Sequence, residues 1–201
     1  MALVVITGGA RSGKSGAAQR LAHERAREGR PVTLVVFGSE SDAEMTERIG
    51  RHRADRPGGI VVVEATSAGD WLPRIAEGSL LVVDCLGTCL GLAMLEAWEA
   101  TAEGSDMNDA HEMPAGFGAR FAESCDLVVC ALLARQGDTL IVTNEVGAGV
   151  VPAFATGRIF RDELGRANER LVRRADVAYL AIVGRLLDIS GLPRDAAWPH
   201  D

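Results

Sequence analysis

The chain has 201 residues, of which 47% are apolar and 24% charged, as in an ordinary globular protein with a sizeable core. Its net charge of −7 argues against bulk binding of nucleic acid, which usually needs a basic surface. No apolar run approaches the ~18 residues of a membrane span, and no signal-like segment opens the chain. We therefore expect a cytoplasmic protein without a membrane span.

A glycine-rich motif follows the first apolar run of the chain. Residues 2–7 read ALVVIT, which predicts a buried strand, and the alanine-rich residues 16–28 predict a helix. Between them lies the pattern G-x-x-x-x-G-K-[ST], made of Gly8, Gly9, Ala10, Arg11, Ser12, Gly13, Lys14 and Ser15. Its glycines let backbone N–H groups point at phosphate oxygens, while Lys14 adds positive charge and the Ser15 hydroxyl can reach Mg²⁺. The motif in this setting predicts a site for a nucleoside triphosphate.

The central part of the chain predicts further strands that alternate with helices. The expected strands cover 32–37, 60–64 and 80–84, and the expected helices cover 41–54, 70–76 and 90–100. The strand over 80–84 is a run of four apolar residues that ends in Asp84, as expected of an acid that holds Mg²⁺ opposite Ser15. A helix cap for the next segment is the alternative role for Asp84.

The second half of the chain continues this alternation after a polar loop over 101–116. Helices are expected over 117–134 and 158–174, strands over 140–143, 177–183 and 186–189, and a loose tail over 191–201. Apolar strands separated by helices predict a mostly parallel sheet with helices on both faces. The sequence thus predicts an α/β P-loop NTPase, with a single domain over 1–190.

Polar residues follow several of the predicted strands directly. The carboxyl ends of parallel strands meet at one edge of a sheet, where ligand sites lie. Besides the glycine-rich motif, this edge is expected to gather Gly38, Ser39, Glu64, Asp84, Asn144 and Glu145. The glycine-rich loop over 144–157 is expected to fold over a ligand. Polar residues of the next helix are expected near this loop, namely Arg158, Arg161, Asp162 and Asn168. The alternative is that residues 144–157 form an ordinary strand-to-helix connection and the next helix has a solvated face.

The helix expected over 41–54 carries a histidine among arginines. Met45, Ile49 and His52 share one helix face because they are spaced by four and three residues. The nearby arginines are Arg48, Arg51, Arg53 and Arg56. The residues leave three alternatives open: a solvated basic helix, a DNA-contacting helix, or a histidine that meets phosphate while arginines neutralise its charge.

The four cysteines do not form a metal-binding pattern. No two of them form a C-x-x-C pair, and no histidine lies at zinc-finger spacing from them. They are Cys85, Cys89, Cys125 and Cys130. In a cytosolic chain we expect them to be reduced and mostly buried thiols.

Several motifs together resemble one enzyme family. They are GGARSGKS, EMTERIGRHRADRP, VVVE, LLVVDCLG, TNEVGAGVVP and RIFRDELGRANE, in order over residues 2–189. This series resembles the bifunctional adenosylcobinamide kinase/adenosylcobinamide-phosphate guanylyltransferase family of cobalamin biosynthesis. The resemblance implies that adenosylcobinamide is phosphorylated with ATP or GTP, and that GMP from GTP is then transferred to that phosphate.

The resemblance also implies roles for individual residues. His52 matches the family position that carries GMP in a GMP-histidine intermediate. Lys14 is expected to be catalytic as the lysine of the phosphate-loop motif. The implied nucleotide contacts are the residues of the glycine-rich motif together with Phe37, Gly38, Ser39, Ala54, Asp55, Arg56, Pro57, Glu64 and Asp84. Mg²⁺ is implied at Ser15 and Asp84. The family fold resembles a recombinase-type P-loop core, and its members form trimers, which implies a homotrimer that binds nucleotide and a corrinoid.

Two other functions use part of the same sequence pattern. A different small-molecule P-loop kinase would need Lys14 and Asp84 but not His52. A recombinase-like ATPase would use the basic stretch over 48–56 for nucleic acid, and single-stranded DNA would then stimulate its hydrolysis of ATP. The acidic net charge and the absence of interleaved aromatic residues disfavour that alternative.

Overall fold

The computed structural model describes residues 1–38, 59–102, 107 and 113–195. These residues form a seven-stranded sheet in the order β3-β2-β4-β5-β1-β6-β7. Neighbouring strands are parallel, except that β6 and β7 pair antiparallel at one edge. The strands are β1 (Leu3–Gly8), β2 (Val32–Phe37), β3 (Ile60–Ala65), β4 (Leu80–Asp84), β5 (Thr139–Val142), β6 (Val177–Ile182) and β7 (Arg185–Asp188).

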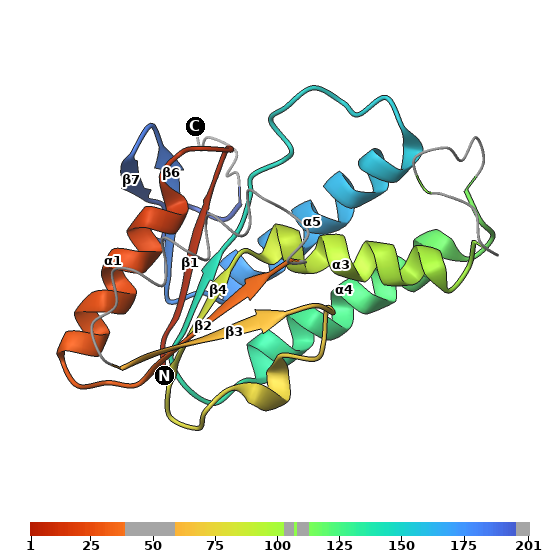
Figure 1. Cartoon of the computed structure of the whole chain (residues 1–201). Helices are drawn as coiled ribbons and strands as arrows, with labels where there is room; N and C mark the ends of the chain where they lie inside the picture. The colour runs from red at the N-terminus through yellow and green to blue at the C-terminus, as the bar shows by residue number, and fades with distance from the viewer. Residues whose placement is uncertain (39–58, 103–106, 108–112, 196–201) are drawn as a thin grey trace, which may run out of the picture.

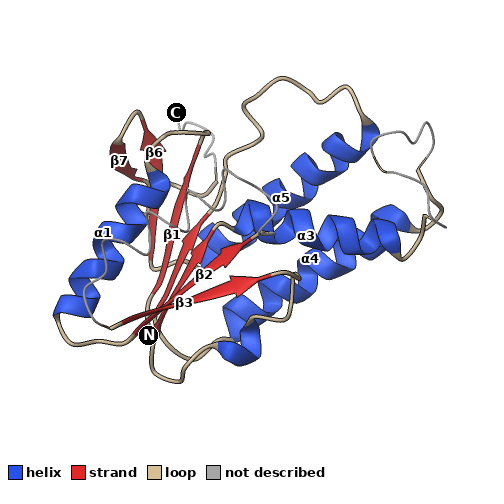
Figure 2. Cartoon of the chain, in the orientation of Figure 1, coloured by secondary structure: helices blue, strands red, loops and turns tan. Residues whose placement is uncertain are grey.

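Helices cover both faces of the sheet. The helices are α1 (Lys14–Arg27), the 3₁₀ turn η1 (Leu72–Arg74), α3 (Leu86–Glu99), α4 (Phe117–Ala134) and α5 (Ala155–Arg174). Helix α1 lies on one face, and α3, α4 and α5 lie together on the other (Figures 1 and 2). Strand β5 separates β1, which leads into the glycine-rich motif, from β4, which ends in Asp84. This arrangement confirms the predicted α/β class with a mostly parallel sheet that has helices on both faces.

The helices differ from the sequence prediction in three places, two at their starts and one in length. Helix α3 begins at Leu86 rather than residue 90, because the apolar residues directly after Asp84 already turn into the core. Helix α5 begins at Ala155 rather than residue 158. The helix expected over 70–76 is only the short turn η1, in which Pro73 supplies no backbone donor. The helix expected over 41–54 lies outside the described residues.

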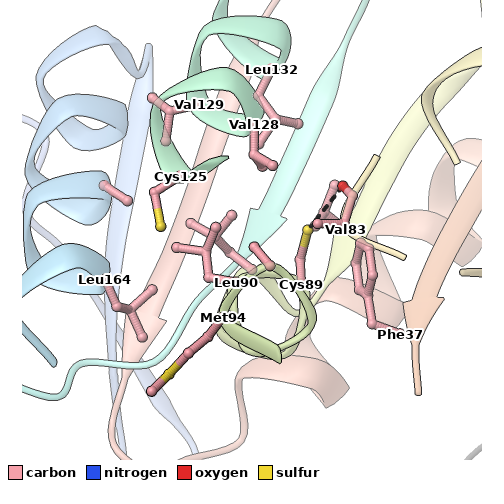
Figure 3. Packing of buried hydrophobic residues seen from close by; sticks show 14 of the residues in the cluster. Phe37, Val83, Cys89, Leu90, Met94, Cys125, Val128, Val129, Leu132 and Leu164 are labelled. Atoms are coloured by element: carbon pink, nitrogen blue, oxygen red, sulfur yellow. Dashed lines mark hydrogen bonds between the residues drawn. The ribbon is translucent and has the colours of Figure 1, made fainter. Parts of the chain in front are cut away.

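The sheet separates two hydrophobic cores of different composition. Alternate residues of each strand point to opposite faces, so Val5 belongs to one core and Ile6 to the other. The core on the α3–α5 face contains large side chains, including Trp71, Phe117 and Phe121. Figure 3 shows how Leu90 and Met94 of α3 pack within it, close to Leu164 of α5 and to the apolar residues of α4. The core on the α1 face is built on the buried alanines of α1, which are Ala17, Ala18, Ala22 and Ala26.

Candidate functional site

The glycine-rich motif forms a tight loop between β1 and α1. Gly8 has no room for a side chain, because a Cβ there would lie 2.4 Å from the carbonyl oxygen of Ala181. Gly13 has a φ of +97° and is the residue that precedes α1. The first turn of α1 contains no acidic residue, so the positive end of its dipole is not neutralised there. The loop therefore presents a helix N-terminus suited to an anion.

Lys14 lies folded over this loop. Its side chain is buried, and its Nζ donates to the Gly9 carbonyl oxygen at 2.6 Å and to Ser12 Oγ at 3.5 Å. Burial lowers the pKa of the Lys14 ammonium, while the nearby Cys85 thiol and Asp84 carboxylate act in the opposite direction. The loop thus holds a poorly hydrated cation that an incoming phosphate would stabilise.

Ser15 and Asp84 meet at the carboxyl edge of the sheet. The Ser15 hydroxyl donates to Asp84 Oδ1 at 3.0 Å, and Asp84 is half-buried at the end of β4. The residue that caps α3 is Cys85, with no side-chain cap bond, so Asp84 does not serve as the helix cap that was its alternative role. A hydroxyl and a carboxylate are hard oxygen ligands that fit Mg²⁺, which keeps water or phosphate oxygens in its other positions.

The loop after β5 is tied to the glycine-rich motif and to α5. The Glu145 backbone N–H donates to the Gly8 carbonyl at 3.0 Å, and the Glu145 carboxylate accepts from the amides of Gly147 and Ala148. Asn168 of α5 accepts from Thr143 Oγ1 at 2.6 Å and donates to the Asn144 carbonyl at 2.9 Å. These bonds fix the exit of β5 between β1 and β4.

The residues of α5 that were expected near this loop divide into two groups. Asn168 contacts the exit of β5, and the Arg158 guanidinium donates to the carbonyls of Pro152 and Ala153. Arg161 instead pairs with its neighbour Asp162 at 2.9 Å. The sequence identified the stretch but not the pairing of Asn168 with Thr143, because the two residues lie 25 positions apart in different motifs and no local pattern joins them.

The other predicted site residues lie farther along the sheet edge or outside the described structure. Phe37 ends β2, but the residue is 1% exposed and its ring packs edge-on against Trp71, so its side chain belongs to the core and does not face a ligand. Gly38 follows it and donates to the Ala65 carbonyl. Glu64 lies near the end of β3, two strands from Asp84. The remaining predicted residues, Ser39, His52, Ala54, Asp55, Arg56 and Pro57, lie outside the described residues.

The sheet order, the glycine-rich loop and the Ser15–Asp84 pair define a P-loop protein of the α/β class. The model of the cobinamide kinase / cobinamide phosphate guanyltransferase family matches residues 4–189. The chain therefore belongs to this family of transferases, whose two activities serve cobalamin biosynthesis. This confirms the family resemblance drawn from the sequence.

Individual relatives match over nearly their whole length. The chain is 33% identical to the bifunctional adenosylcobalamin biosynthesis protein CobP of Pseudomonas aeruginosa, over 94% of this chain and 98% of that protein. It is 29% identical to the bifunctional adenosylcobalamin biosynthesis protein CobU of Salmonella typhimurium, over 90% and 96%. A KaiC-like protein of Pyrococcus horikoshii has a similar structure, with a TM-score of 0.46 and 16% identity over 89% of this chain and 70% of that one. Among the described residues, no helix is long and apolar enough to cross a membrane.

Proposed function

We propose that this chain phosphorylates adenosylcobinamide with ATP or GTP and then transfers GMP from GTP to the new phosphate, giving adenosylcobinamide-GDP. The observation that carries the proposal is the assembled phosphate site, in which buried Lys14 and the Ser15–Asp84 pair meet at the N-terminus of α1. Membership of the family supplies the two reactions. Both reactions need a bound triphosphate, and one phosphate loop can serve both.

In the kinase step, the substrate hydroxyl attacks the γ-phosphorus and the nucleoside diphosphate leaves. Such transfers depend mainly on positioning and on neutralising charge. Lys14 supplies a cation beside the loop, and the helix N-terminus supplies N–H donors. Ser15 and Asp84 would hold Mg²⁺, which neutralises charge on the phosphates when bound.

In the guanylyl transfer, we assign the nucleophile to His52. An imidazole nitrogen forms a bond to the α-phosphorus, and the bond to the bridging oxygen breaks, so pyrophosphate leaves. A phosphate oxygen of adenosylcobinamide phosphate then attacks the same phosphorus and displaces the imidazole. The sequence supports this assignment, because His52 lies among arginines within the residues that the family model matches.

The covalent step is tested with GTP labelled at the α-phosphate. We expect acid-labile, base-stable label on the chain in the presence of Mg²⁺, and no label on His52→Ala. His23→Ala is the matched control, because His23 lies on α1 and should keep the label. Label that persists in His52→Ala would show that another residue is the nucleophile. No label on the wild-type chain, with phosphorylation of adenosylcobinamide intact, would reduce the function to that of a plain kinase.

The proposal extends to a homotrimer that works in the cytoplasm. Apolar side chains in the loop directly before α5 are strongly exposed, with Val150 at 96%, Val151 at 61% and Phe154 at 75%. This exposure supports burial against another subunit. All four cysteines are free thiols, which fits a reducing compartment. Light scattering of the purified protein should give three times the chain mass, and a monomeric mass would contradict the trimer.

A further inference from the structure

The turn between β6 and β7 has an unusual backbone for its sequence. Val183 and Gly184 connect the paired residues Ile182 and Arg185, with φ values of +42° and +81°. Positive φ at both central residues is typical of a type I′ turn, which favours Asn-Gly. A β-branched residue rarely adopts positive φ, and Val183 is 88% exposed, so little packing offsets the strain. Such an outlier suggests that the turn has a task beyond joining two strands.

This turn contacts the phosphate loop directly. The Gly184 backbone N–H donates to the Ser12 carbonyl oxygen at 2.9 Å. The approach is close, because a Cβ on Gly13 would lie 3.1 Å from Gly184 Cα. Strand β6 pairs with β1 as far as Gly8, whose register partner is Ala181. Figure 1 shows the β6–β7 hairpin beside the loop that joins β1 to α1. The β6–β7 hairpin therefore packs directly against the phosphate loop, although the two segments lie near opposite ends of the sequence.

The bond to Ser12 also sets the direction of the next amide. The Ser12 carbonyl and the Gly13 N–H belong to one peptide unit, in which a trans geometry points them in opposite directions. When Gly184 holds the carbonyl toward the hairpin, the Gly13 N–H must point away from it. Backbone N–H groups of such loops are the donors that bind phosphate oxygens. Fixing one carbonyl thus orients one phosphate donor.

We propose that the β6–β7 turn, through Gly184, is a positioning element that holds the phosphate loop in its phosphate-binding conformation. This inference rests on the proposed function, since it needs a nucleotide bound at the loop. Gly184 acts through Ser12 and Gly13 and does not itself contact the nucleotide. Because the donors in question meet phosphates and not the base, the effect is the same for ATP and GTP.

Gly184→Ala tests the proposal, and Gly29→Ala is its matched control. Both glycines have similar positive φ values, +81° and +77°, and neither has another atom within 4 Å of an added Cβ. Alanine keeps the backbone N–H, so both substitutions act through similar backbone strain that shifts the turn. Only at Gly184 does this shift displace an N–H that bonds the phosphate loop. We expect Gly184→Ala to weaken the Kd for GTP and ATP about fivefold to tenfold, and Gly29→Ala less than about twofold, as for loss of one hydrogen bond. The kcat at saturating nucleotide should be retained, whereas general unfolding would lower kcat and leave KM unchanged.

Hydrogen exchange of the wild-type chain provides a second measurement that does not depend on any variant folding. If the turn favours the phosphate-binding loop, bound GTP must stabilise the turn to the same extent. We expect GTP to slow amide exchange in the peptide over 182–188. Equal affinities of Gly184→Ala and Gly29→Ala, or unchanged exchange in that peptide while wild-type protein binds GTP, would overturn the positioning role alone. A wild-type chain that binds neither GTP nor ATP would overturn the proposed function as well.

Discussion

The two faces of the sheet are packed in contrasting ways. On the α1 face, small alanine side chains let the helix approach the strands closely, and the first residues of that helix are Lys14 and Ser15. On the α3–α5 face, the core contains large aromatic side chains such as Phe121. The contrast shows that one face of the sheet positions the phosphate site and the other stabilises the fold. The α1 side places the helix N-terminus beside Asp84, while the other side holds the larger of the two hydrophobic cores.

The largest effect is expected from a change that concerns only the α1 side. Lys14→Ala removes the cation from the phosphate loop and should lower kcat/KM for both reactions by about 10²- to 10³-fold, as for other groups that stabilise transition-state charge. Stability should change little, because the lost contacts are balanced by removal of a partly desolvated charge. Steady-state kinetics and thermal unfolding measure the two quantities. Arg27→Ala, in the last turn of the same helix, should leave both unchanged, and normal rates in Lys14→Ala would contradict a shared phosphate loop.

A change in the aromatic layer should show the opposite pattern. Phe121 is fully buried and stacks against Phe117 and Phe160, with ring centroids 6.3 Å away in each case. Phe121→Ala should lower the free energy of unfolding by about 3–5 kcal/mol, as other buried Phe→Ala changes do, without altering the Kd for GTP of the folded protein. Urea unfolding and calorimetric titration measure these values. Leu127→Ala, at a 66% exposed position of the same helix, is the control that should be nearly neutral. A large loss of GTP affinity in Phe121→Ala would contradict the prediction that the α3–α5 face affects stability and not nucleotide binding.

Matched substitutions on the two faces sharpen the comparison. Ala18 of α1 and Ala97 of α3 are each 1% exposed, and enlarging either to leucine should cost about 1–3 kcal/mol through overpacking. Only Ala18→Leu should also raise the Mg²⁺ concentration needed for activity, because it pushes α1 and thus Ser15 away from Asp84. Activity measured against Mg²⁺ concentration tests this difference. The same Mg²⁺ requirement in both variants would show that spacing on the α1 face does not set the Ser15–Asp84 contact.

The smallest effect concerns alkaline stability on the α3–α5 face. Burial raises the pKa of the Cys89 thiol to about 12, and its sulfur contacts the Ala68 carbonyl at 3.6 Å (Figure 3). Above about pH 8.5 the unfolded chain loses this proton while the folded chain keeps it, so stability falls as the pH rises toward the folded pKa. Urea unfolding at increasing pH should show this loss. Cys89→Ala should make the loss shallower, whereas Cys130→Ala, at an exposed position, should not. An equal slope in all three proteins would assign the loss to other groups.

The sequence by itself determined the features that depend on neighbouring residues. The phosphate loop of residues 8–15 was predictable, because its glycine-rich motif lies directly between an apolar run and an alanine-rich segment. Apolar strands alternating with helices were enough for an α/β class with a parallel sheet. The motifs that occur in order over most of the chain were enough to indicate the family. The helix starts were less predictable, because packing of residues such as Leu86 into the core extended α3 beyond its local pattern.

Only the tertiary structure decided the contacts between distant segments. The Ser15–Asp84 bond exists because β5 alone separates β1 from β4, and no local pattern fixes that strand order. The bond from Gly184 to Ser12 likewise requires β6 to pair with β1, which places a C-terminal turn beside an N-terminal loop. The physical reason is that a hydrogen bond depends on distance and direction in space, and strand pairing sets both for residues that are far apart in the chain.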